Sequence, residues 1–164
     1  MKKILLASAF ALCLLTRAQS AGNLKIGAHF GLPSGNTSSL YNFYLGVDVA
    51  YMFLVSDKFN LGITTGFSFF RSKDWNSFKY GTLSLVPLAA TMEYTFSEIF
   101  SFGIDLGYSF CFNFLAKSGS FYYQPKVAYH LGRNEVYVGY MGIKRENNSP
   151  INSVTLGYAY SFGE

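Results

Sequence analysis

Residues 99–114 read IFSFGIDLGYSFCFNF and alternate between large apolar side chains and small or polar ones. From Phe100 to Phe114 every second residue is phenylalanine, isoleucine, leucine or tyrosine. A period of two is that of a β-strand, whose successive side chains point to opposite faces. Strands of soluble proteins usually have about 5–6 residues, whereas a tilted strand that crosses a bilayer needs about 9–11. This stretch therefore predicts a membrane-crossing strand.

The same alternation recurs along the chain in eight segments. They are residues 23–32, 41–53, 59–70, 82–95, 100–114, 121–131, 135–143 and 153–162. Three connections are short (55–58, 96–98 and 132–134), and four are longer and more polar (33–40, 71–79, 116–120 and 144–152). Short turns at one end and longer loops at the other are typical of outer-membrane barrels. The sequence thus predicts an all-β fold: an eight-stranded antiparallel up-and-down transmembrane β-barrel, with both termini on the periplasmic side.

The first twenty residues have the features of a cleaved signal peptide. Met1, Lys2 and Lys3 form a basic start, residues 4–15 are an apolar run, and residues 18–20 read Ala-Gln-Ser. The run is shorter than the roughly 20 residues of a membrane-spanning helix. We expect residues 1–20 to be a signal peptide and residues 21–164 to be the barrel domain.

Cleavage changes the charge and the cysteine content. Loss of Lys2, Lys3 and Arg17 reduces the 13 basic residues to 10, against 9 acidic ones. The mature chain is therefore nearly neutral, which does not favour binding to nucleic acid. Cys111 is the one cysteine that remains, so no disulfide can form within the chain. We expect it to be a small filler of the lumen.

The composition of the polar face separates a membrane barrel from a soluble one. In residues 59–70 that face carries Asn60, Gly62, Thr64, Gly66 and Ser68. A face exposed to bulk water usually carries lysine and glutamate instead, and small residues suit the narrow interior of an eight-stranded barrel. A soluble periplasmic barrel of the lipocalin type, with the aromatic side chains lining a ligand cavity, is the alternative.

Many aromatic residues fall near the ends of the predicted strands, as the aromatic girdles of membrane barrels do. They are Tyr41, Phe53, Phe59, Phe69, Tyr80, Tyr94, Phe100, Phe114, Phe121 and Phe162.

Two residues are unusual for their positions in strands. Pro87 cannot donate a ladder hydrogen bond, which predicts a bulge near residues 86–88. Gly142 stands where residues 135–143 would present an apolar side chain, which predicts a short seventh strand.

The signal peptide, the eight aromatic strands, the alternating loop lengths and the final LGYAYSF segment (156–162) resemble a known group. They are similar to the small eight-stranded outer-membrane β-barrels of Gram-negative bacteria, the OmpA membrane domain and the OmpX-like proteins. The resemblance implies a bacterial outer-membrane location, contact with membrane lipid and lipopolysaccharide, and insertion by the barrel-assembly machinery. Tyr158, Tyr160 and Phe162 would supply the alternating aromatic residues that this machinery reads.

Charged and histidine side chains within the strands mostly share the polar face. They are Lys25, His29, Asp48, Glu93, Asp105, Lys126, His130 and Glu135. An isolated buried charge is costly, so we expect a lumen network of paired charges. Folding about the loops would place Lys25 near Asp48, and Asp105 near His130 with Glu135 close by. Such a network would be a structural plug or the lining of a narrow polar path.

The histidines do not match an enzyme motif. The lipid A deacylases of this barrel class carry a histidine and a serine two residues apart, but His29 is followed by Phe30-Gly31 and His130 by Leu131-Gly132. The two histidines lie far apart in sequence and Cys111 is alone. We therefore expect no catalytic residue, no metal site and no cofactor.

The predicted outer loops are rich in cations, which are candidate contacts to lipopolysaccharide phosphates. They are Arg71, Lys73, Lys79, Lys117, Lys144 and Arg145, against the anions Asp74 and Glu146. We expect a monomeric outer-membrane protein with a structural or surface-interaction role. The alternatives are a narrow channel for small solutes and the soluble ligand-binding barrel.

Overall fold

The computed structural model describes residues 22–73, 83–113, 116–144 and 149–162. The predicted signal peptide, residues 1–20, lies outside the described residues. No helix in these ranges is both long and apolar enough to cross a membrane.

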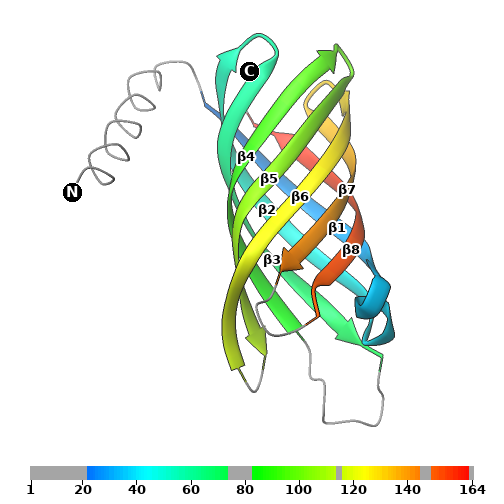
Figure 1. Cartoon of the computed structure of the whole chain (residues 1–164). Helices are drawn as coiled ribbons and strands as arrows, with labels where there is room; N and C mark the ends of the chain where they lie inside the picture. Colours follow the sequence, from blue (N-terminus) through cyan, green and yellow to red (C-terminus); the bar gives the residue numbers. More distant parts are fainter. Residues whose placement is uncertain (1–21, 74–82, 114–115, 145–148, 163–164) are drawn as a thin grey trace, which may run out of the picture.

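Eight antiparallel strands close into a single barrel in sequence order, with β8 pairing back to β1 (Figure 1). The strands are β1 Asn23–Ser34, β2 Tyr41–Ser56, β3 Phe59–Ser72, β4 Leu83–Ser97, β5 Phe100–Asn113, β6 Ala116–Leu131, β7 Asn134–Lys144 and β8 Ile151–Ser161. The β2–β3, β4–β5 and β6–β7 turns lie at one end of the barrel, together with the start of β1 and the end of β8. We call this end the short-turn end. The opposite end, which carries the longer connections, is the loop end. This architecture confirms the predicted fold class.

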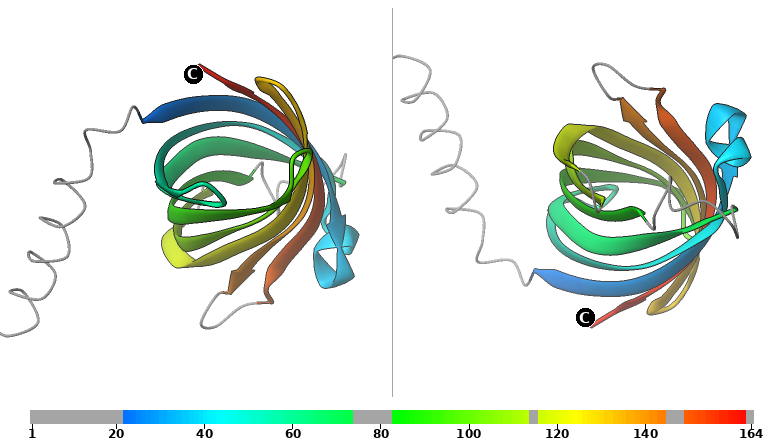
Figure 2. Two further views of the ribbon diagram at one scale, coloured as in Figure 1. Left: turned by 90° about the horizontal axis from the view of Figure 1, so that it is seen from above. Right: turned by 90° about the horizontal axis from the view of Figure 1, so that it is seen from below.

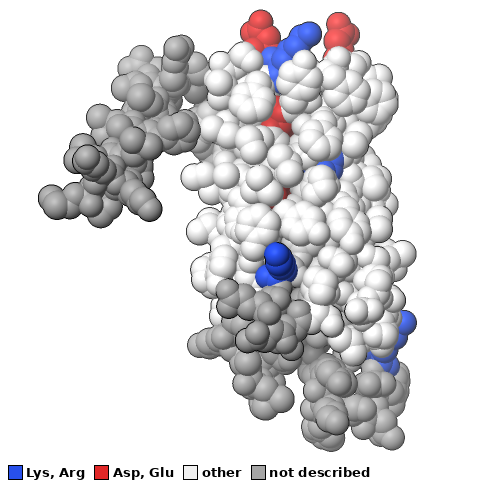
Figure 3. Space-filling view, in the orientation of Figure 1, with Lys and Arg blue, Asp and Glu red and all other residues white. Residues whose placement is uncertain are grey.

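Strand alternation separates an apolar outer wall from a mostly polar interior. On β5, Phe100, Phe102, Tyr108 and Phe110 are exposed, whereas Ser101, Gly103, Asp105, Ser109 and Cys111 are buried. The face of the barrel that Figure 3 shows carries few charged side chains between its two ends. A soluble lipocalin-like barrel would need the opposite orientation, with the aromatic side chains around a cavity. That alternative is therefore wrong.

The loop end departs from prediction in two places. Residues 116–120 form the start of β6 and not a loop, because they pair with β5 and Ala116 lies opposite Asn113. In the first connection, β1 continues to Ser34 and a 3-10 helix, η1 Gly35–Ser39, follows it. Thr37 of η1 is buried, donates a hydrogen bond to Pro150 O and accepts one from Asn152 N. These bonds tie the first connection to the start of β8.

The predicted bulge at residues 86–88 is wrong. Thr65 pairs with Leu88 and Ser68 with Leu85, so the β3–β4 register is the same on both sides of Pro87. The proline interrupts the pairing of residues 66 and 67 without adding a residue to either strand, and the Thr65 hydroxyl donates to Pro87 O over 2.8 Å. The prolyl N–H is thus lost without a change of register.

The prediction of a short seventh strand is confirmed, since β7 and β8, with 11 residues each, are the shortest strands, although β7 continues past Gly142 to Lys144. The ring of Tyr123, on the neighbouring β6, lies over Gly142 in the space that a Cβ atom would occupy. The glycine therefore accommodates an aromatic ring on the outer wall.

The lumen is filled in two layers, and Figure 2 shows the barrel from each end. Near the loop end an apolar cluster closes it: Tyr41, Tyr44, Phe70, Leu83, Leu85, Ala89, Cys111, Tyr122, Met141, Ile143 and Ile151. We call this cluster the apolar plug. Tyr44 and Phe70 stack within it, with ring centroids 4.6 Å apart. Tyr41 belongs to this plug, so its assignment to the outer aromatic girdle is wrong; Tyr80 and Phe114 lie outside the described residues.

Candidate functional site

The polar layer lies between the apolar plug and the short-turn end. All eight predicted network residues are on inward-facing positions of their strands. These are Lys25 and His29 on β1, Asp48 on β2, Glu93 on β4, Asp105 on β5, Lys126 and His130 on β6, and Glu135 on β7.

Lys25 is the centre of the group nearest the short-turn end. Its Nζ atom lies 2.7 Å from Glu93 Oε2 and 2.7 Å from Glu135 Oε2. The side chains are 12%, 6% and 5% exposed for Lys25, Glu93 and Glu135. One ammonium group therefore bridges two buried carboxylates that come from opposite parts of the barrel wall.

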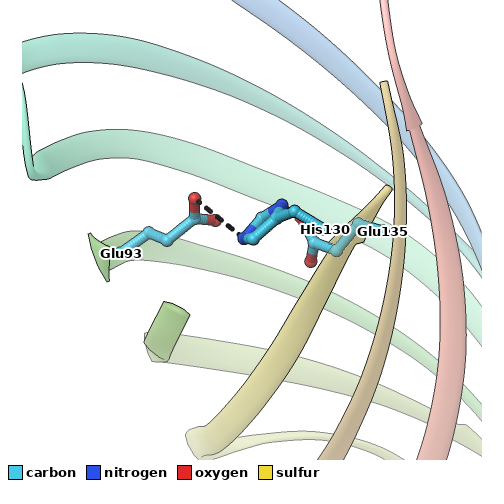
Figure 4. A group of neighbouring side chains, drawn as sticks. All are labelled: Glu93, His130 and Glu135. Atoms are coloured by element: carbon cyan, nitrogen blue, oxygen red, sulfur yellow. Dashed lines mark ion pairs between the residues drawn. The ribbon is translucent and has the colours of Figure 1, made fainter. Parts of the chain in front are cut away.

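His130 lies between the same two carboxylates, as Figure 4 shows. Its Nε2 atom is 3.9 Å from Glu93 Oε1, and its Nδ1 atom is 3.8 Å from Glu135 Oε2. The hydroxyl of Ser101 lies 2.7 Å from Nε2. We call Glu93, His130 and Glu135 the Glu–His–Glu cluster.

A second histidine makes a separate set of contacts deeper in the lumen. His29 Nδ1 lies 2.6 Å from Asp48 Oδ2, and His29 Nε2 lies 3.0 Å from the hydroxyl of Ser68. The Tyr137 hydroxyl donates to the same Asp48 oxygen over 3.2 Å. This serine–histidine–aspartate order is the connectivity of a nucleophilic triad. The pocket beside these contacts, bounded also by Leu85, has no free volume large enough for a water molecule.

The third set pairs Asp105 with Lys126. Lys126 Nζ lies 3.0 Å from Asp105 Oδ2 and 5.5 Å from the centroid of the Tyr137 ring. Asp105 Oδ1 is buried and has no hydrogen-bond partner among the described residues. It borders a central cavity of about 40 Å³, which is large enough for an ordered water molecule.

Two of the pairings expected from loop geometry are wrong. In the β1–β2 register Asp48 lies opposite Gly27, and Lys25 crosses the barrel to Glu93 and Glu135. Asp105 lies opposite Gln124 and forms its ion pair with Lys126, two residues further along β6. Hairpin geometry predicts neighbours along adjacent strands, whereas in a narrow closed barrel a long side chain reaches across the lumen. His130 and Glu135 are paired directly across the β6–β7 turn, as that geometry predicts.

The sequence reasoning missed Ser68, Ser101 and Tyr137 as parts of these contacts. It considered a serine only two residues from a histidine, whereas Ser68 and Ser101 reach the histidines from other strands. The polar phase of the alternation places both serines, Ser68 included, on the inner face, but it does not indicate that they contact the histidines.

A vestibule opens at the short-turn end, next to the Glu–His–Glu cluster. Its volume is about 470 Å³, and Lys25, Glu93 and His130 form part of its lining. Glu98 and Arg133, which belong to the turns, also border it.

Three of the predicted loop cations lie in the described part of the chain. Arg71 at the end of β3, Lys73 beside it and Lys144 at the end of β7 are all exposed. Lys79 and Arg145 lie outside the described residues, and so does the side chain of Lys117.

Solved structures with the same fold are small outer-membrane barrels. Ail, the attachment invasion locus protein of Yersinia pestis, is 15% identical with a TM-score of 0.59, over 86% of this chain and 99% of that one. The N-terminal β-barrel domain of Pseudomonas aeruginosa OprF is 12% identical with a TM-score of 0.60, over 85% and 97% of the two chains. The outer-membrane enzyme PagL is 13% identical with a TM-score of 0.59, over 83% and 98%. No protein-family model matches the sequence, and no curated protein matches it at a significant level.

These similarities define the class by its fold: the chain has the fold of the small eight-stranded outer-membrane β-barrels. An attachment protein and an enzyme both have this fold, so the fold does not specify a role.

Proposed function

We propose that this protein is a monomeric outer-membrane barrel that supports the bacterial envelope and binds lipopolysaccharide through cations at its loop end. The mature chain is exported by a cleaved signal peptide, is inserted by the barrel-assembly machinery, and has both termini in the periplasm. Its role is structural and interactive and not enzymatic.

The observation that carries this proposal is the difference in charge between the two ends of the barrel. Among the described residues, the exposed charged side chains at the loop end are the cations Arg71, Lys73 and Lys144. At the short-turn end, two anions and two cations are exposed: Asp57, Glu98, Lys58 and Arg133.

The side chains of two loop-end cations lie on the outer wall, which supports contact with lipid. Arg71 follows exposed Phe69 and buried Phe70 on β3, so it lies on the outer wall. Lys144 also lies on the outer wall, paired with exposed Phe121. Cations at the rim of an apolar wall are positioned at the height of lipid headgroups, where lipopolysaccharide carries its phosphates.

The test measures lipopolysaccharide binding by the folded barrel in detergent as a function of salt. The variant Arg71→Gln/Lys144→Gln is compared with Lys58→Gln/Arg133→Gln, which removes two cations from the other end. Exposed ion pairs contribute about 0.2–1 kcal/mol each, so the loop-end variant should bind roughly 2–30-fold more weakly. Equal affinities of the two variants would refute the proposal.

The filling of the lumen argues against the narrow-channel alternative. The apolar plug closes the loop-end half, and the polar layer encloses a central cavity of about 40 Å³. A conducting path would require both layers to rearrange, so we favour the structural and interactive role.

A further inference from the structure

The Glu–His–Glu cluster has the composition and spacing of a metal site. Glu93, His130 and Glu135 each offer one ligand atom, and these atoms all lie within 4.8 Å of one another (Figure 4). Zinc binds imidazole nitrogen and carboxylate oxygen at about 2.0–2.2 Å, often with three protein ligands and a water. The three ligand atoms are slightly farther apart than the ligands of one zinc ion, so the side chains would move inward to bind it.

The charge of the cluster favours an additional cation. Glu93 and Glu135 are about 95% buried, and Lys25 supplies one positive charge against their two negative ones. With a neutral imidazole at His130, the four groups carry one net negative charge. Buried carboxylates are stable when they are paired or coordinate a metal, so the cluster has capacity for a cation.

Ser101 orients the imidazole as a second-shell partner does in metal sites. Its hydroxyl lies 2.7 Å from His130 Nε2, and Ser101 itself is fully buried. Metal-bound histidines usually hydrogen-bond through their other ring nitrogen, which fixes the ring and the tautomer. Here Nδ1, 3.8 Å from Glu135 Oε2, is the nitrogen available to an ion.

The vestibule gives the metal ion access to the cluster and gives the displaced Lys25 ammonium group a path to water. Lys25, Glu93 and His130 all line this 470 Å³ space. An ion can therefore reach Glu93 and His130 from solution, and the ammonium group of Lys25 can move into water without crossing the barrel.

We propose that Glu93, His130 and Glu135 bind a divalent transition-metal ion of the zinc class, which enters from the vestibule and displaces the ammonium group of Lys25. This inference is independent of lipopolysaccharide binding, because the cluster and the loop-end cations lie at opposite ends of the barrel.

The test uses untagged, folded barrel in detergent micelles, with Co²⁺ as a spectroscopic probe. Wild-type protein should show an intense visible absorption of Co²⁺ in a site of low coordination number, and Zn²⁺ should remove it. His130→Gln should lose this signal, whereas the matched control His29→Gln, which changes the other lumen histidine, should keep it. Unboiled gel mobility confirms that each variant is folded.

Two further variants test the neighbours. Ser101→Ala should weaken Co²⁺ binding about 10–100-fold. Lys25→Met removes the competing ammonium group, so Co²⁺ no longer has to break an ion pair when it binds. This variant should bind Co²⁺ at least about tenfold more tightly than the wild type. A wild-type spectrum equal to that of His130→Gln would overturn the proposal, as would loss of the signal in His29→Gln. If Lys25→Met does not fold, the comparison of the two histidine variants still decides the question.

Discussion

Lys25 allows the contribution of the lumen charges to stability to be measured directly. The change is Lys25→Met, which keeps most of the side-chain volume and removes the ammonium group. At 2.7 Å and an effective dielectric constant of about 20, each ion pair of Lys25 is worth about 6 kcal/mol of Coulomb energy. Desolvation of the three groups offsets most of this energy.

Removal of the ammonium group leaves Glu93 and Glu135 facing each other. Ligand oxygens of the two carboxylates lie within 4.8 Å, so their repulsion is at least about 3.5 kcal/mol at the same dielectric constant. Breaking a buried pair by removing one partner usually costs about 3–5 kcal/mol. We therefore expect Lys25→Met to lower the free energy of unfolding by about 3–5 kcal/mol.

The assay is urea unfolding in lipid vesicles, with the folded fraction read from the mobility of unboiled samples on gels. Lys58→Met, which removes an exposed cation from the β2–β3 turn, is the matched control and should cost under about 1 kcal/mol. The charge-free variant Lys25→Met/Glu93→Gln/Glu135→Gln should recover most of the loss.

The reasoning is refuted if Lys25→Met costs no more than Lys58→Met. It is also refuted if the charge-free variant is less stable than Lys25→Met alone, because removal of the repulsion would then have no benefit.

Three further measurements address the outer wall, the apolar plug and the inner histidine. Leu106→Arg places a charge on the outer wall at the middle of β5 and should cost about 2–4 kcal/mol in vesicles; a cost near zero would contradict a lipid-facing wall. Tyr44→Ala/Phe70→Ala removes the stacked rings of the plug but leaves the polar layer in place, so it should give no steady single-channel conductance, like the wild type; steady conductance by either protein would restore the channel alternative. Ser68→Ala should cost about 1 kcal/mol through the lost contact with His29, and a serine-directed fluorophosphonate should label neither protein.

The strands and their faces could be predicted from the sequence because each is a local property. Alternation within residues 100–114 fixes which side chains share a face, and burial of Ser101, Asp105 and Ser109 follows that phase. Once the barrel closes, the inward face of every strand is known without knowledge of its partner.

The contacts inside the lumen could not be predicted in the same way. Lys25 pairs with Glu93 and Glu135, which are separated from it by 68 and 110 positions in the sequence and lie on strands that are not its neighbours. These pairs depend on strand register, tilt and side-chain reach, none of which the alternation records. Tyr41 shows the same limit: its place at a strand end suggests a girdle residue, but the register shift between Tyr41 and Phe43 turns its ring into the lumen.

The small residues of the inner face create space for side chains and not for solvent. At Gly31 a Cβ atom would overlap the ring of Tyr44, and at Gly157 it would overlap the ring of Tyr137. Both tyrosines also use their hydroxyls: Tyr44 contacts Thr155, and Tyr137 donates to Asp48. In the sequence, an inner face rich in glycine and serine resembles the lining of a pore. When the same strands also place long polar side chains on that face, this composition indicates a closed interior.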